Sequence, residues 1–215
     1  IFRMAAFSVA GLLVLIVGYV IAKGAGVVDW QFLTRAVAQR DITKGGIMPA
    51  IVGTLYLGLG VFLVSIPMGV FAAIYLNEYA PDTKMSRLIR VAIRNLAGVP
   101  SIVYGLFGFA VFVNFLDFNT SLLSAILTLS CMTLPWVITA SEESLKAVPF
   151  SYREGAYALG STRWQMIKKI VIPQAMPGMI TGSILGLSRA LGETAPIIIV
   201  GATFYMRDLP DSISD

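Results

Sequence analysis

Long runs without a charged residue are the feature that most constrains this chain. They cover Met4–Ala22, Gly45–Asn77, Asn95–Leu116, Phe118–Ser141 and Ile170–Ser188. A helix that crosses the hydrocarbon core of a bilayer needs about 20 apolar residues, so each run is long enough to span a membrane. Only 13% of the 215 residues are charged, compared with about 25% in soluble domains. The sequence therefore predicts an all-α, polytopic transmembrane helical bundle with five spans.

Prolines and two charged residues subdivide these runs. The second run is longer than one span requires and contains Pro67, and the fourth contains Pro135. Because proline removes a backbone donor inside a helix and an overlong helix tilts in the bilayer, we expect kinked or tilted helices at both places. The fifth run is interrupted by Arg189 and Glu193 and then continues as the apolar stretch Thr194–Met206.

The two ends of the chain indicate that it is part of a longer protein. It begins at Ile1 inside an apolar run and finishes in the polar stretch Arg207–Asp215. The first run lacks the cleavage pattern of a signal peptide. We therefore interpret residues 1–215 as a single transmembrane domain that is truncated at both ends and that carries five of an expected six spans.

The basic residues between the spans predict the orientation of the chain. One side of the membrane receives Arg3, Lys84, Arg87, Arg90, Arg94, Lys146, Arg153, Arg163, Lys168 and Lys169, and the other receives Lys23, Arg35, Arg40, Lys44 and Arg207. The side richer in Lys and Arg is cytoplasmic under the positive-inside rule. The chain is thus expected to start inside and finish outside. Because these residues flank apolar runs, the net charge of +4 indicates membrane orientation and contact with lipid, and no nucleic-acid binding is expected.

The near absence of histidine and cysteine excludes several kinds of chemistry. The chain has no His and one Cys, Cys131. It therefore offers no disulfide framework, no Cys/His zinc site and no Ser-His-Asp triad. We assign no catalytic residue and no metal site.

A polar segment between the fourth and fifth runs, residues 142–173, carries helix punctuation. Ser151 followed by Glu154 fits a capping box that starts a helix at Tyr152, and Gly160 can adopt the left-handed conformation that ends it. We expect this helix to expose Ala156, Tyr157 and Leu159, a pattern that suits insertion into a groove on a partner.

The same segment signals a second helix. Thr162 with Gln165 repeats the capping box, and Pro173 is expected to stop this helix near Ile172. The prediction is a short helix, a sharp turn and a second helix that leads into the membrane.

These residues resemble a known family motif. Glu154-Gly155-Ala156, three residues, Gly160, nine residues and Ile170-Val171-Ile172-Pro173 are similar to the EAA loop, E-A-A-x3-G-x9-I-x-L-P, of the permease subunits of bacterial ABC importers. Gly155 replaces the middle Ala, and Ile172 replaces Leu. The resemblance implies the type I ABC importer permease fold and a cytoplasmic coupling loop over residues 142–173.

In that family the first helix of the loop docks into a cleft on a separate ATPase. The resemblance therefore implies that the residues that transmit closure of the ATPase are Glu154, Gly155, Ala156, Tyr157, Leu159 and Gly160. The plainer interpretation is that Glu154 only caps a helix and Gly160 only ends one, and both interpretations can hold together.

No segment of the chain fits an ATP site. Gly155 and Gly160 match the start of a P-loop, but Ser161 and Thr162 follow where Lys and then Ser/Thr are required. We expect this chain to bind no cofactor, with ATP and Mg²⁺ bound by the partner ATPase. The chain is thus predicted to be a transporter subunit and not an enzyme in itself.

Arg189 and Glu193 are the charged residues inside the last apolar region. Insertion scales assign about 2.5 to 3.5 kcal/mol to an Arg at the centre of a span, so such residues seldom face lipid. At i and i+4 they can neutralise each other. One interpretation is a pair that only packs against a neighbouring helix. The other is that Arg189 meets an anion in a water-filled path while Glu193 holds the guanidinium and competes with that anion, since guanidinium suits phosphate oxygens.

Small residues recur at four-residue spacing in the same span. They are Gly178, Gly182, Gly186 and Ala190. Such a row lets another helix approach closely. Arg189 lies about 100° around the helix from this row, so we predict a packing face and a polar face side by side.

Two further segments resemble the phosphate importer permeases of the PstA type. They are Ser188-Arg189-Ala190-Leu191-Gly192-Glu193-Thr194-Ala195-Pro196 and Gly98-Val99-Pro100-Ser101-Ile102-Val103-Tyr104-Gly105, within a resemblance that runs from about Thr54 to Met206. It implies location in the bacterial inner membrane, six spans, and a substrate pathway that includes Arg189, Glu193, Thr194, Ser188 and Ser101.

The same resemblance implies specific partners. Phosphate would come from an external phosphate-binding protein and pass between this subunit and a PstC-like permease subunit, driven by two PstB-like ATPase subunits. Three alternatives stay open: an ABC importer permease for another anion, an ion-coupled secondary transporter that uses Glu193 as a proton relay, and a membrane scaffold that transports nothing.

Overall fold

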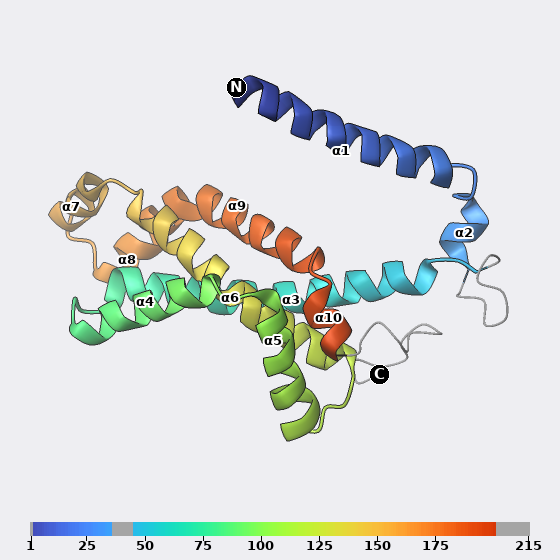
Figure 1. The fold of residues 1–215 in the computed structure, drawn as a ribbon. Helices are drawn as coiled ribbons and strands as arrows, with labels where there is room; N and C mark the ends of the chain where they lie inside the picture. The colour runs from blue at the N-terminus through green and yellow to red at the C-terminus, as the bar shows by residue number, and fades with distance from the viewer. Residues whose placement is uncertain (1, 36–44, 201–215) are drawn as a thin grey trace. The chain divides into compact units, whose positions relative to one another are not determined.

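The computed structural model describes residues 2–35 and 45–200, and every regular element within them is helical (Figure 1). The chain divides into two compact units, one built on Ile1–Val52 and the other on Gly53–Met206. Arg40, Lys44, the end of the apolar stretch Thr194–Met206 and the tail Arg207–Asp215, all used in the sequence predictions, lie outside the described ranges. The assignment of a single domain to residues 1–215 stays a prediction.

The first unit contains the first predicted span. Helix α1 covers Phe2–Gly24, so the run Met4–Ala22 is helical as predicted. A short helix, α2, covers Trp30–Thr34, and the Asp29 carboxylate accepts a hydrogen bond from the Phe32 N–H at its start. An Asp at this position satisfies a backbone donor that the first helical turn leaves free.

The second unit contains the remaining elements. In chain order they are α3 (Met48–Ile74), the π turn η2 (Tyr75–Tyr79), α4 (Lys84–Ala97), α5 (Ser101–Gly108), the π segment η3 (Phe109–Phe115), α6 (Leu122–Lys146), α7 (Phe150–Ala158), α8 (Arg163–Met166), the π turn η4 (Ile167–Val171), α9 (Ile172–Leu191) and α10 (Ala195–Val200). Helix α3 belongs to this unit from Gly53 onward.

Four helices in the described ranges are long and apolar enough to cross a membrane: Arg3–Gly24, Met48–Tyr79, Leu122–Lys146 and Arg163–Leu191. The predicted third span is different, because α4 and the helix Ser101–Phe115 meet at an angle of 101°. The break falls at Gly98-Val99-Pro100, where proline disfavours helical geometry in the residue before it. The membrane can thus be crossed five times only if this bent pair counts as one span.

The basic segment after α3, which carries Lys84, Arg87, Arg90 and Arg94, is helical and forms α4. The Thr83 hydroxyl caps α4 by accepting from the Ser86 N–H at 3.3 Å. The segment alternates basic and apolar residues at helical spacing, and counting charges alone does not reveal that periodicity.

Three prolines lie within helices of the second unit for which the sequence made a prediction. Helices α3 and α6 continue through Pro67 and Pro135, and the expected kinks or tilts there stay predictions. Pro173 does not stop its helix, so that expectation was wrong: η4 and α9 follow α8 without a break as far as Leu191. The Ile172 N–H bonds to the Ile167 carbonyl, a π-type contact directly before the proline, and local π geometry is one way in which membrane helices accommodate proline.

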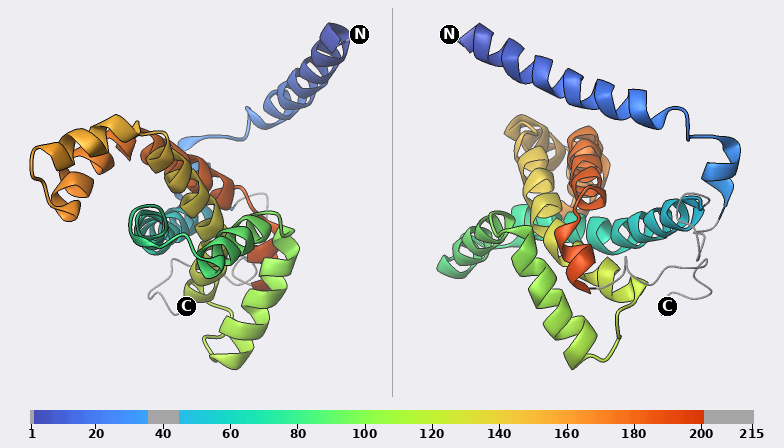
Figure 2. Two further views of the ribbon diagram at one scale, coloured as in Figure 1. Left: turned by 90° about the vertical axis from the view of Figure 1, so that its left-hand side faces the viewer. Right: turned by 45° about the vertical axis from the view of Figure 1, so that its right-hand side comes forward.

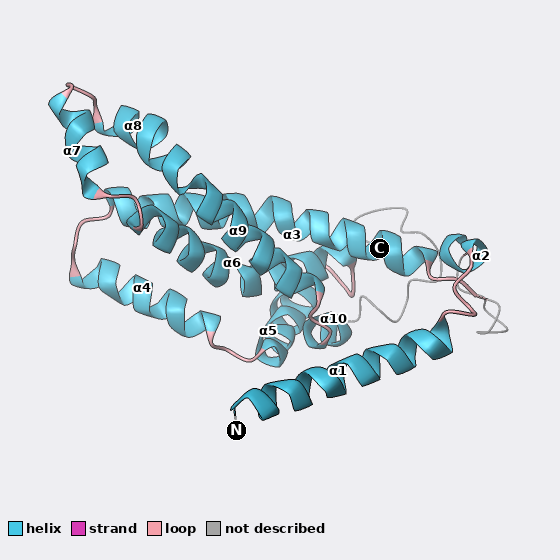
Figure 3. Ribbon diagram, turned by 90° about the horizontal axis from the view of Figure 1, so that it is seen from above, coloured by secondary structure: helices cyan, strands magenta, loops and turns pink. Residues whose placement is uncertain are grey.

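Helix α6 forms the centre of the second unit. It packs against α9, α4 and α5, and Figures 2 and 3 show α9 running beside it. Close approach of α3 to α6 depends on small residues: a Cβ on Gly60 of α3 would lie 2.3 Å from Ile126, and one on Gly69 would lie 2.7 Å from Val137.

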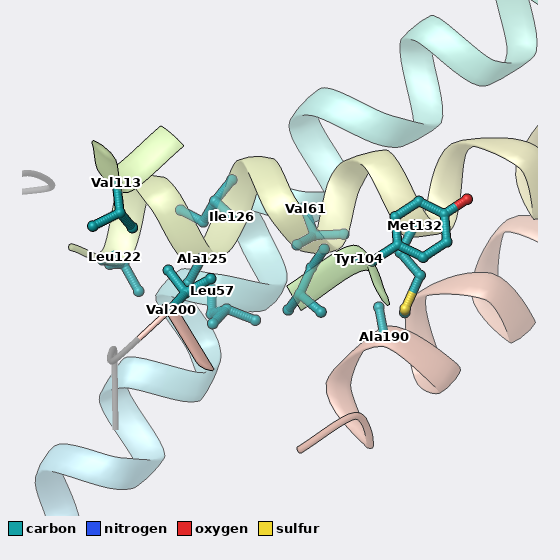
Figure 4. Packing of buried hydrophobic residues seen from close by; sticks show 11 residues of the cluster. Leu57, Val61, Tyr104, Val113, Leu122, Ala125, Ile126, Met132, Ala190 and Val200 are labelled. Atoms are coloured by element: carbon teal, nitrogen blue, oxygen red, sulfur yellow. The ribbon is translucent and has the colours of Figure 1, made fainter. Parts of the chain in front are cut away.

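A first hydrophobic core lies at one end of α6 and joins six elements: α3, α5, η3, α6, α9 and α10. Its buried members include Leu57, Val61, Tyr104, Val113, Leu122, Ala125, Ile126, Met132, Ala190 and Val200 (Figure 4).

A second core lies toward the α7–α8 end of α6 (Figure 3). Its buried members include Ala73, Leu76, Leu145, Val148, Ala156, Met166 and Ile167. It therefore joins the end of α3 and the end of α6 to the helices that follow α6.

Candidate functional site

Helices α7 and α8 form an elbow around Gly160. Gly160 has φ +76°, the left-handed conformation that its position predicts and that an L side chain rarely adopts. The Ser161 N–H bonds to the Ala156 carbonyl and the Gly160 N–H to the Tyr157 carbonyl. These two bonds make a Schellman motif, which satisfies the last carbonyls of α7 and fixes the direction in which the chain leaves it.

The two predicted capping boxes have different outcomes. The box that starts α8 is confirmed, because Thr162 Oγ1 accepts from the Gln165 N–H and Gln165 Oε1 accepts from the Thr162 N–H. The box at Ser151 is wrong. Helix α7 begins at Phe150 directly after Pro149 and has no side-chain cap, so Ser151 already lies within the helix.

One face of α7 is open and the other is packed. Tyr157 is 49% exposed and Leu159 is 88% exposed, as predicted. Glu154 is exposed, and a Cβ on Gly155 would meet nothing within 4 Å. Ala156 corrects the prediction: it is 2% exposed and belongs to the second core. A small residue there lets α7 approach the bundle closely, so Ala156 cannot lie on the open face.

A buried ion pair lies beneath the elbow, and the sequence analysis missed it. Glu78 of η2 accepts from Arg153 of α7 at 2.9 Å, and their side chains are 6% and 13% exposed. Arg163 of α8 donates to the Glu78 carbonyl and lies over the ring of Tyr79, with 5.1 Å from its Cζ to the ring centroid. A cavity of about 520 Å³ adjoins these residues and is lined in part by Lys146. The one available signal was that Glu78 is the first charged residue after the longest uncharged run.

A second charged group joins α4 to α6. Arg90 pairs with Glu142 and also donates to the Leu76 carbonyl. Lys146 pairs with Glu142 at 2.8 Å. The Arg90 and Glu142 side chains are 22% and 12% exposed, so a partly buried charge pair ties α6 to α4, and Arg90 in turn ties α4 to the end of the α3 span.

The intramembrane pair forms as predicted. Arg189 Nε lies 3.5 Å from Glu193 Oε1, with side-chain exposures of 45% and 20%. Helix α9 ends at Leu191, so Glu193 lies just beyond the helix rather than within it. The Arg189 Cζ also lies 4.5 Å from the centroid of the Trp136 ring on α6, a cation–π contact that the sequence analysis missed.

This geometry leaves part of the guanidinium open. Stacking on Trp136 uses the face of the group, and the contact with Glu193 uses Nε. Within residues 2–35 and 45–200, no hydrogen bond or ion pair occupies the two terminal nitrogens of Arg189. Those nitrogens carry the parallel donors that recognise an oxyanion.

The other predicted pathway residues are less closely associated with this pair. Ser188 and Thr194 are exposed, and Ser101 begins α5 and is partly buried. In the part of the chain that the structure describes, no side-chain hydrogen bond joins any of the three to Arg189 or Glu193. Their role in a pathway stays a prediction.

The small residues of α9 lie against α6. A Cβ on Gly182 would lie 2.4 Å from the Ala140 Cβ, and one on Gly178 would lie 2.5 Å from the Ser144 Oγ. One on Gly186 would lie at an ordinary 3.5 Å from Val137 Cγ2. Ala190 is fully buried in the first core. Arg189 therefore lies on the face next to this contact.

Residues 65–209 match the family described as "Binding-protein-dependent transport system inner membrane component". This chain belongs to that family. The resemblance to ABC importer permeases is thereby confirmed. As a member of this family with several long apolar helices, the chain is a multi-pass membrane protein.

Several curated relatives of this transport system component are named as permeases. It is 34% identical to the Probable ABC transporter permease protein YqgI of Bacillus subtilis, over 92% of this chain and 67% of the relative. It is 39% identical to the Phosphate transport system permease protein PstA 2 of Mycobacterium bovis, over 83% of this chain and 58% of that protein. For PstA 1 of Mycobacterium tuberculosis the identity is 38%, over 87% of this chain and 62% of that protein. The chain thus spans about three fifths to two thirds of the length of these relatives.

Solved structures of other transporters share the fold. A chain of the MetNI methionine ABC transporter, in inward facing conformations, matches with a TM-score of 0.58 and 23% identity, over 73% of each chain. A chain of an amino acid ABC transporter matches with a TM-score of 0.56 and 21% identity, over 69% of this chain and 68% of that one. The predicted all-α ABC importer permease fold of this component is therefore confirmed.

Proposed function

We propose that this chain is the phosphate-translocating membrane subunit of an ABC importer whose ATP is hydrolysed on separate ATPase subunits. The proposal rests mainly on the structure of the elbow, the helices α7 and α8 that meet at Gly160. Its first helix, α7, has an open face that includes Tyr157 and Leu159, while its opposite face is packed into the bundle through Ala156. A helix held on one face and open on the other suits insertion into a groove on a partner.

The orientation and the partners follow from the family. The elbow would lie on the cytoplasmic side and contact the ATPase through Glu154, Gly155, Tyr157 and Leu159. ATP binding would close the ATPase dimer, move the elbow and open the spans outward, and hydrolysis would reset them. A second, PstC-like permease subunit would complete the pathway, and an external binding protein would deliver the anion.

Phosphate is the substrate that the relatives and the site favour together. Two of the relatives described above are named phosphate transport permeases. Arg189 has terminal donors that no group within the described residues occupies and that suit an oxyanion, and Glu193 lies close enough to compete for the guanidinium. A group that binds an anion and is also drawn to an internal carboxylate can release that anion, which transport requires.

Reconstitution tests the proposal. The full-length protein should be placed in liposomes with its partner permease and ATPase subunits, with binding protein outside and ATP inside. We expect uptake of radiolabelled phosphate that requires ATP and the ATPase. Preferential uptake of sulfate would replace phosphate with another anion. Uptake without the ATPase would replace the whole proposal with an ion-coupled transporter.

Gly160→Pro tests the elbow within that system. Proline fixes φ near −65°, which is incompatible with the φ of +76° at this position. We expect the ATPase to copurify poorly with this variant and phosphate-stimulated ATP turnover to be lost, while the partner permease still copurifies. Gly11→Ala is the control, because Gly11 lies outside the elbow and an added Cβ there meets nothing within 4 Å. Normal phosphate-stimulated turnover in Gly160→Pro would contradict the role of the elbow.

A further inference from the structure

Glu78 lies at the junction between the α3 span and both helices of the elbow. It belongs to η2, where the Ala80 N–H bonds to the Tyr75 carbonyl and the α-helical register ends. Its side chain is 6% exposed. A buried carboxylate is strongly disfavoured unless it is paired and hydrogen-bonded. Asn77 Nδ2 donates to Glu78 Oε1 at 2.8 Å and Arg153 Nη2 donates to the same atom at 2.9 Å.

Arg153 joins three parts of the fold at this point. It projects from α7 to Glu78, which lies 75 residues earlier in the chain. Its Nη1 donates to the Val148 carbonyl at 2.7 Å, and its Nη2 also donates to the Leu145 carbonyl at 3.0 Å. The guanidinium therefore holds the end of α6, the start of α7 and the end of the α3 span in one arrangement.

Helix α8, the other helix of the elbow, binds the backbone carbonyl of Glu78. Arg163 of α8 donates to the Glu78 carbonyl and stacks on Tyr79. Beneath these contacts, Ala156 and Met166 are each 2% exposed and pack in the same core as Leu76. The side chain of Glu78 is thus bound by the helix before Gly160, and its carbonyl by the helix after it.

The geometry points to Glu78 as a positioning residue that makes the elbow and the α3 span move together. Displacement of α7 would reach α3 through the Arg153–Glu78 pair, because that pair is buried and short and reinforces the packing of Ala156 in the same core. This inference rests on the proposed function and deepens it. It assigns the transmission of ATPase closure to the Arg153–Glu78 ion pair, which lies on the packed side of α7.

Glu78→Gln is the test, with an exposed ion pair as its control. Gln keeps the shape of the side chain and one acceptor but removes the charge that holds Arg153. Arg87 and Asp82 form a pair of similar length, 3.0 Å, that is 67% and 85% exposed. Exposed pairs contribute little, so Asp82→Asn should change nothing. The double variant Glu78→Gln/Arg153→Gln checks whether an unpaired buried Arg is the cause of any defect.

The assay uses the full reconstituted complex and compares phosphate uptake with ATP turnover. For Glu78→Gln we expect the complex to assemble and basal ATP turnover to stay within about twofold, while phosphate moved per ATP falls about tenfold or more. The double variant should also be uncoupled, because the connection is still missing. Restored coupling in the double variant, or an unchanged ratio in Glu78→Gln, would overturn the inference. So would a parallel loss of assembly and turnover, which would make Glu78 only a stabilising residue.

Hydrogen exchange provides a readout that does not depend on phosphate. In Glu78→Gln, amide exchange over residues 150–166 should become faster than in the wild-type protein, with unchanged exchange in the middle of α6. Equal exchange in the two proteins would contradict the mechanical link. If the wild-type complex fails to take up phosphate, the proposed function is wrong, whereas the exchange result still decides whether Glu78 holds the elbow.

Discussion

Replacing Gly182 with Ala should disrupt the contact between α6 and α9. The added Cβ would lie 2.4 Å from the Ala140 Cβ, whereas two carbon atoms pack best at about 3.5 to 4.0 Å. The two helices must therefore separate locally by roughly 1 Å or more. Neither methyl group can rotate away, since each is fixed directly to its backbone.

The magnitude follows from comparison with Gly186 one turn later. Its added Cβ would lie 3.5 Å from Val137 Cγ2, which is an ordinary contact. Both changes gain the same intrinsic helix preference of Ala over Gly, about 0.5 to 1 kcal/mol, so this contribution cancels between them. Overpacking costs about 1 to 3 kcal/mol. Gly182→Ala should be less stable than Gly186→Ala by about that amount.

Unfolding of the full-length protein in detergent measures this difference. Tryptophan fluorescence can follow the transition on heating or on addition of SDS, with both variants measured in the same micelle. Gly178→Ala should be intermediate, because the Ser144 hydroxyl that its Cβ would approach at 2.5 Å can rotate. Equal midpoints for Gly182→Ala and Gly186→Ala would refute the packing argument.

Two further predictions concern Arg189. Arg189→Gln should lower phosphate uptake by the reconstituted complex about tenfold or more and leave assembly intact, because it removes the positive charge and the parallel donors of the guanidinium; wild-type uptake would show that this residue only packs. Trp136→Leu should raise the phosphate concentration for half-maximal uptake more than it lowers the maximal rate, since loss of the 4.5 Å stacking contact frees the guanidinium to turn. Trp136→Phe keeps an aromatic face and serves as its control, and identical half-saturation in the Leu variant would dissociate Trp136 from the anion site.

Local rules were sufficient for much of the fold. A glycine after the last helical residue predicts the turn at Gly160, and a Thr with a Gln three residues later predicts the start of α8. Both depend only on backbone groups within a few residues, but the same capping rule fails at Ser151, because Pro149 directly precedes the helix and α7 already begins at Phe150. The uncharged runs likewise locate the helices, since the bilayer sets their length. They could not reveal the 101° bend between α4 and α5, because hydropathy carries no information about direction.

The candidate site is formed by contacts between residues far apart in the chain, which no local sequence pattern predicts. Ala156 was expected on an exposed apolar face, but its methyl group is buried in the core that also contains Leu76. Glu78 and Arg153 meet across 75 residues, and Trp136 reaches Arg189 only because α6 and α9 pack closely. The spacing of a motif says which residues belong to one helix. It does not say which face of that helix the rest of the chain covers.

The two π turns near the elbow give the proposed path a physical basis. One, η2, contains Glu78 and ends the α3 span at Tyr79, and the other, η4, connects α8 to α9 and ends at Val171, two residues before Pro173. Each therefore lies where the elbow meets a span. A π turn shifts the helical register and is frequently found at functional sites. Helix α8 continues through η4 into α9 without a break, whereas α7 is joined to α6 and α8 only by short loops, so side-chain contacts must hold α7 against the end of the α3 span. That requirement is what the Arg153 contact with Glu78 meets.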